Sequence, residues 1–165
     1  MSVHSSRIRL AALAAGGAWA LPKLLGGAGT ARAQATPTAA DPLDALPLVD
    51  IIATDFDFEM PTELSAGWTR LHLRNWGAED HHAQLLRLHD DVTFGQLVAT
   101  FQEQGEAALA LVDLAGGPGT VHSGSTSEAV VLLEPGEDAV ACFIDGPADE
   151  LHITMGMLTP LTVIS

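Results

Sequence analysis

The sequence predicts an all-β fold, a β-sandwich with a short helical insert. Short segments that alternate between apolar and polar residues recur along the chain, and this period of two is typical of strands with one buried face. Turn residues separate these segments at short intervals, as in sandwich domains. One stretch, residues 92–119, lacks the alternation and has helical spacing instead.

The strands are expected in a regular series. The first is predicted over residues 50–60, where Phe56 and Phe58 share the inward parity and Asp55 and Asp57 share the solvated one. The others are predicted over residues 68–75, 81–88, 127–133, 139–144 and 158–164.

The helical insert begins with a capping box. Thr93 is placed to cap the helix and Gln96 to reach back to it, which satisfies two backbone N–H groups at once. Gly105 is expected to end this helix. A second short helix is expected over residues 107–114, before a glycine-rich turn at residues 116–119.

Residues 1–35 have the layout of a secretory signal peptide. Two arginines precede an apolar run over residues 10–25, and small residues follow up to a cleavage position near Ala35. A membrane anchor is the alternative, but Pro22 and Lys23 interrupt the run. We therefore expect an exported chain, periplasmic or extracellular, with no integral membrane span after cleavage.

The part beyond the signal peptide, about 130 residues, suits a single domain. Residues 36–47, with three prolines, are expected as an extended leader, and residues 48–165 as the domain. All 21 acidic residues follow residue 35, against three arginines, so the formal net charge of this part is −18. Such a chain will not bind nucleic acid through its phosphates. The acidic surface suits a partner protein with a basic surface, or serves solubility alone.

The segment most informative about function is residues 142–157. It contains the only cysteine, Cys142, together with His152 and two of the four methionines, Met155 and Met157. Thiolate, imidazole and thioether donors around one loop suit a soft or borderline metal ion, copper above all.

A second imidazole is available from the His81-His82 pair. Neighbouring residues of a strand point to opposite faces, so only one of the two can face Cys142. His81 shares its parity with the apolar Ala83 and Leu85. The residues alone do not decide whether His81 or His82 is the ligand, or whether Met157 or Met155 is.

The order of these residues resembles the cupredoxins, the family of blue copper proteins. The series reads Asn75, His81, Pro135-Gly136, Cys142, His152 and Met157. The resemblance covers about residues 48–165 apart from the insert. Nine residues separate Cys142 from His152, and this gap is similar in length to the one in the copper domains of nitrite reductases. Asp80 and His82 stand where the family usually has Pro and Asn.

The resemblance implies a Greek-key β-sandwich that holds one type 1 copper ion. It assigns the ligands as His81, Cys142, His152 and Met157. It further implies a one-electron carrier that works with a redox partner protein. A copper chaperone or storage protein, and a metal-free extracellular interaction module, are the alternatives. An enzyme is not expected, because a single type 1 centre has no open position for substrate.

Overall fold

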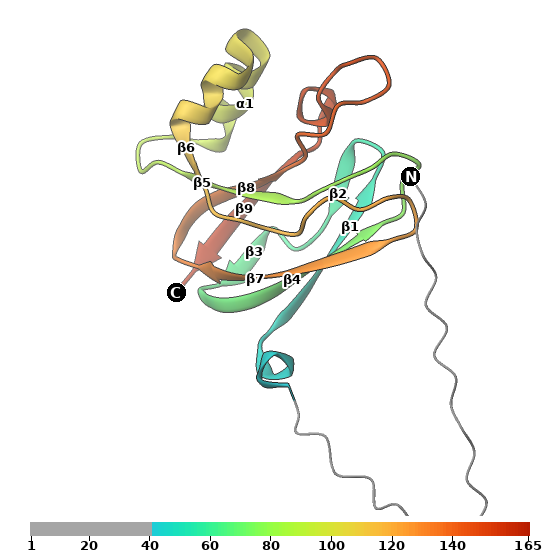
Figure 1. Cartoon of the computed structure of the whole chain (residues 1–165). Coiled ribbons are helices and arrows are strands. Elements are labelled where there is room, and N and C mark those ends of the chain that lie inside the picture. The colour runs from blue at the N-terminus through green and yellow to red at the C-terminus, as the bar shows by residue number, and fades with distance from the viewer. Residues whose placement is uncertain (1–40) are drawn as a thin grey trace, which may run out of the picture. The chain divides into compact units, whose positions relative to one another are not determined.

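The computed structural model of the chain describes residues 41–165, which form a sandwich of two β-sheets (Figure 1). The predicted signal peptide and the first part of the predicted leader lie outside these residues. Within the leader, Pro42–Ala45 form a short 3-10 helix, η1, capped by the side chain of Asp41. No helix of the described part is long and apolar enough to cross a membrane.

Each sheet of the sandwich is mixed, with one parallel pair. The strands of the first sheet, in spatial order, are β2 (Asp57–Glu59), β1 (Leu48–Thr54), β4 (Gly67–Asn75) and β7 (Thr126–Leu133). Those of the second are β3 (Glu63–Ser65), β9 (Leu158–Ile164), β8 (Gly136–Ala141), β5 (Gln84–Leu88) and β6 (Val112–Leu114). The parallel pairs are β1 with β4 and β3 with β9. This architecture confirms the predicted fold class.

The central part of the second sheet is buried on both faces, as the end of strand β8 shows. Val140 and Cys142 face the core between the sheets, whereas Ala139 and Ala141 pack against a second apolar cluster on the outer face. The α-helix α1 (Phe94–Gln104) covers that outer face, as Figure 1 shows beside β5, β6 and β8. The alternation of side chains along a strand therefore turns Cys142 into the sandwich.

The helix α1 begins and ends where the sequence predicted. Thr93 accepts a hydrogen bond from the backbone N–H of Gln96, and the Gln96 side chain accepts one from the Thr93 N–H. Gly105 follows the helix at a φ of 59°, a conformation that glycine adopts without steric cost.

The expected second helix over residues 107–114 is wrong in part. A 3-10 helix, η2 (Gly105–Leu111), occupies its first half, and the rest is strand β6, which pairs with β5. The alanines favour a helix locally, but the open edge of β5 offers hydrogen bonds that residues 112–114 take instead.

The predicted first strand over residues 50–60 is also wrong. It is a hairpin, in which β1 ends at Thr54 and pairs with β2 through a turn at Asp55 and Phe56. The turn shifts the alternation by one residue, so the odd-numbered Ile51 and Ala53 are buried on β1, whereas the even-numbered Phe58 is buried on β2. Because the turn has only two residues, the sequence pattern of this hairpin resembles that of one continuous strand.

Candidate metal centre

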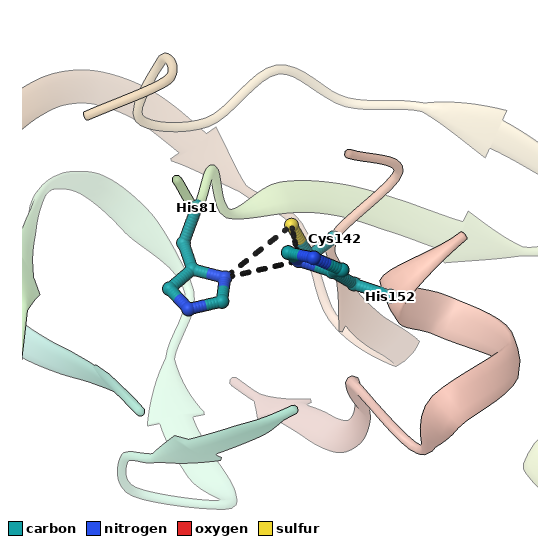
Figure 2. A group of neighbouring side chains, drawn as sticks. All are labelled: His81, Cys142 and His152. Carbon is teal, nitrogen blue, oxygen red and sulfur yellow. Dashed lines mark hydrogen bonds between the residues drawn. The ribbon is translucent and has the colours of Figure 1, made fainter. Parts of the chain in front are cut away.

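Three separate elements bring His81, Cys142 and His152 to one end of the sandwich. His81 lies just before β5 and forms a two-way backbone bridge with Val121. Cys142 follows β8 directly, and His152 opens the 3-10 helix η3 (His152–Met155). Figure 2 shows the two imidazoles and the thiol pointing toward one another.

The donor atoms of this group are close together. The Nδ1 atoms of His81 and His152 are 3.1 Å apart. The Sγ atom of Cys142 lies 3.5 Å from Nδ1 of His152 and 3.9 Å from Nδ1 of His81. Nitrogen and sulfur donors that share one ion, at about 2.0 Å and about 2.3 Å from it, are themselves about 3–4 Å apart. The three side chains therefore fit a single metal ion.

The chemistry of the set points to the kind of metal. Two imidazoles and a thiolate, all three buried without exposed surface, are the equatorial donors of trigonal copper sites. A hard ion such as Mg²⁺ or Ca²⁺ prefers oxygen ligands, and no oxygen belongs to this trio. The donor set therefore fits copper, as the sequence predicted.

Met157 is held next to two of these residues. Its backbone N–H donates to the carbonyl of His152 at 3.0 Å, and its carbonyl accepts from the N–H of Cys142 at 3.1 Å. Its side chain is fully buried in the core that contains Cys142. Met155, by contrast, is half-buried and packs toward Gly146, in the loop between Cys142 and His152.

His81 faces the core with Ala83 and Leu85, as its parity predicted. Its Nε2 atom lies 3.3 Å from a carboxylate oxygen of Asp55 in the β1–β2 turn. Burial lowers the pKa of His81 below its ordinary value, although the hydrogen bond to Asp55 opposes this. The ring is therefore neutral near pH 7, as a metal ligand must be.

His82 points away from the three donors. Its Nε2 accepts a hydrogen bond of 2.8 Å from the backbone N–H of Phe143. His82 thereby ties the segment that follows Cys142 to the strand that follows His81. Burial lowers the pKa of His82, so its ring stays neutral and keeps the lone pair that this bond needs.

The His152 ring is covered by two side chains. The Phe56 ring meets it edge-on with the centroids 5.1 Å apart, and Glu79 Oε2 lies 3.7 Å from its Nε2 atom. Among the described residues, this Nε2 is the one buried side-chain nitrogen or oxygen without a hydrogen-bond partner. Glu79 supplies the carboxylate that lies nearest to this nitrogen.

The thiol of Cys142 needs a positive partner to ionise. Burial raises its pKa, and the backbone N–H groups of His82 and Ile144 oppose this only in part. A bound cation stabilises the thiolate directly, because a coordinating thiol is deprotonated. The site is thus arranged for a metal thiolate rather than for a free reactive cysteine.

The other histidines of residues 41–165 lie apart from the centre. His72, His89 and His122 each contact a surface carboxylate. None of them belongs to the group of potential ligands in the described residues.

Sequence reasoning missed the groups around the imidazoles. Asp55 was predicted on the solvated face of a strand, and it instead accepts hydrogen bonds in a turn at the site. Phe56 and Glu79 were not singled out for the site at all. No spacing in the sequence signals these contacts, since they depend on a hairpin and a loop meeting in space.

Comparison with solved structures identifies the fold. Neither a family model nor a curated protein sequence matches the chain. Among solved structures, the reduced auracyanin of Roseiflexus castenholzii superposes with a TM-score of 0.50 at 16% identity, covering 72% of this chain and 97% of that one. The chain has the cupredoxin fold.

Two other cupredoxins give similar figures. Auracyanin B has a TM-score of 0.48 at 21% identity, over 72% of this chain and 89% of its own. Rusticyanin from Thiobacillus ferrooxidans has a TM-score of 0.48 at 15% identity, over 71% of this chain and 76% of its own. Because identity this low establishes a fold and no more, function has to be argued from the side chains of the site.

Proposed function

We propose that this protein is an exported carrier of single electrons with one type 1 copper ion, held by His81, Cys142, His152 and Met157. The observation that carries the proposal is the fully buried His-Cys-His group, with donor atoms 3.1–3.9 Å apart. A bound copper ion would supply reversible exchange between Cu(II) and Cu(I). The imidazoles suit both states, and the thiolate and thioether favour Cu(I).

The chain's own contribution is a rigid and dry site. Backbone hydrogen bonds link Cys142 to Met157 and Met157 to His152, and His82 ties down Phe143. Because each donor is anchored independently of the metal, the site changes little between oxidation states. Burial excludes water, which would otherwise add ligands and reorganise on electron transfer.

Burial also supports a carrier over the other function classes. A chaperone has to release copper through an exposed ligand, and an enzyme needs an open position for substrate. All three donor side chains have 0% exposure. The acidic surface supports a basic redox partner, and the predicted signal peptide supports a periplasmic or extracellular location.

The proposal is tested with copper-loaded protein. Electron self-exchange is measured by nuclear magnetic resonance line broadening, and copper loss to a Cu(I) chelator is followed in parallel. We expect fast exchange and slow loss, and Cys142→Ser should abolish the visible copper band while His122→Gln, at the exposed surface, leaves it unchanged. Rapid loss with slow exchange would indicate a chaperone, and no stoichiometric copper binding would indicate an interaction module.

A further inference from the structure

Asp55 is the carboxylate that approaches the predicted ligands most closely. It lies in the β1–β2 turn, where its Oδ1 accepts hydrogen bonds from the backbone N–H groups of Ala78 at 2.9 Å and Glu79 at 3.1 Å. These bonds are made by the loop that leads to His81. They orient the carboxylate, so that its third contact, at 3.3 Å to Nε2 of His81, has a fixed direction.

That contact determines which nitrogen of His81 carries the proton. A carboxylate accepts hydrogen bonds and donates none, so Nε2 must be the protonated atom. The lone pair is then on Nδ1, which is the atom that faces Cys142 and His152. A carboxylate in this position orients the ring and makes it a stronger donor to a metal.

Gly77 gives independent evidence that this contact is built into the fold. A Cβ atom at this residue would overlap Oδ1 of Asp55 and would lie 2.8 Å from Nε2 of His81. Gly77 is not among the glycines with positive φ, so its backbone does not require glycine. The Asp55 carboxylate, the His81 imidazole and the backbone nitrogen of Asp55 together leave no room for a side chain there.

The same turn also contacts the second imidazole. Phe56 has a φ of 72°, which is uncommon for a bulky residue, and its ring lies against that of His152. The β1–β2 turn therefore reaches both histidines, through Asp55 on one and Phe56 on the other. A strained conformation of this kind persists only where its surroundings hold it.

We propose that Asp55 is a positioning residue of the metal centre, which fixes the tautomer of His81 and whose negative charge favours Cu(II) over Cu(I). The inference rests on the proposed function. Coulomb attraction is proportional to charge, so the carboxylate stabilises a doubly charged ion more than a singly charged one. Removing the charge should therefore weaken Cu(II) binding more than Cu(I) binding and raise the reduction potential.

The test compares three variants of the full mature protein by voltammetry and by Cu(II) and Cu(I) competition titrations. Asp55→Asn keeps a hydrogen-bond acceptor and removes the charge, whereas Asp55→Ala removes both. Asp57→Asn is the matched control, since it removes one charge from an exposed neighbour that contacts neither histidine. Circular dichroism verifies that each variant is folded.

We expect Asp55→Asn to weaken Cu(II) binding about 10- to 100-fold, the usual effect of losing such a partner. Each tenfold fall in the ratio of Cu(II) to Cu(I) affinity raises the potential by about 59 mV. Asp57→Asn should change the ratio less than twofold. An unchanged potential in Asp55→Asn, or an equal rise in Asp57→Asn, would overturn the charge effect.

A second measurement needs no copper. Nitrogen-15 resonance of the metal-free protein reports the His81 tautomer, and we expect protonated Nε2 in the wild type and a mixture in Asp55→Ala and in Gly77→Ala. A wild type with protonated Nδ1 would overturn the positioning role. If the tautomer is as expected and copper does not bind, the proposed function fails while the positioning of His81 by Asp55 stands.

Discussion

The ion pair between Arg87 and Asp138 fixes the alignment of the two strands that lead to the metal centre. Arg87 on β5 and Asp138 on β8 are register partners, joined through Nε to Oδ1 at 2.9 Å and Nη2 to Oδ2 at 3.2 Å. The Asp138 side chain is fully buried, and that of Arg87 is 21% exposed. His81 precedes β5 and Cys142 follows β8, so a slip of these strands would separate the two donors.

Arg87→Ala would leave the Asp138 carboxylate buried without its cation. Breaking a buried pair in this way costs about 3–5 kcal/mol, and because Arg87 still reaches solvent we expect the lower end, about 3 kcal/mol. That is a large part of the roughly 5–15 kcal/mol that holds a domain together. Urea unfolding of the metal-free protein, followed by fluorescence, measures the change.

Arg74→Ala provides the matched control. Its guanidinium pairs with Asp50 at the surface, with side-chain exposures of 42% and 49%, so the loss should be about 0–1 kcal/mol. The double variant Arg87→Met/Asp138→Leu should recover most of the stability, because an apolar pair replaces the ionic one. If Arg87→Ala cost no more than Arg74→Ala, the buried pair would not be what secures the register.

Three further outcomes are expected. Thr93→Ala removes the capping box of α1 and should cost about 1 kcal/mol in thermal unfolding; an unchanged melting temperature would contradict this. Met157→Leu keeps the packing but loses the thioether, so copper should still bind with a shifted potential, and an identical potential would mean that Met157 only packs. Hydrogen bonds from Arg74 and His72 lower the pKa of Asp50 below its ordinary 3.8. The stability that the Asp50 carboxylate adds is therefore present above its pKa in the unfolded chain and lost as the pH falls through its pKa in the folded chain. Asp50→Asn should destabilise the protein at pH 6 and have little effect well below pH 4. The same difference in unfolding free energy between wild type and variant at both pH values would contradict the assignment.

Local patterns predicted part of the candidate metal centre, and the choice between the paired histidines and between the two methionines came from the family resemblance. Parity places His81 with the apolar Ala83 and Leu85, and the structure has it on the core side. Cys142 and His152 belong to a single segment with the only thiol. Strand alternation and donor chemistry are properties of short stretches, so they can be recognised without knowledge of the tertiary fold.

The surroundings of the centre could not be read in the same way. Asp55 and Asp57 look alike in the sequence, as acids that alternate with phenylalanine, yet the turn between β1 and β2 brings only Asp55 onto His81. Asp138 is buried as the partner of Arg87, which comes from another strand. Such contacts join residues distant in the chain, and single-sequence periodicity carries no information about them.

Copper titration of the mature protein, followed by visible absorption and electron paramagnetic resonance, tests the central claim most directly. The expected result is one copper ion per chain, with an intense visible band and narrow copper hyperfine splitting, both lost in Cys142→Ser. Weak or non-stoichiometric binding, or the same spectrum in Cys142→Ser, would contradict a type 1 site at His81, Cys142 and His152.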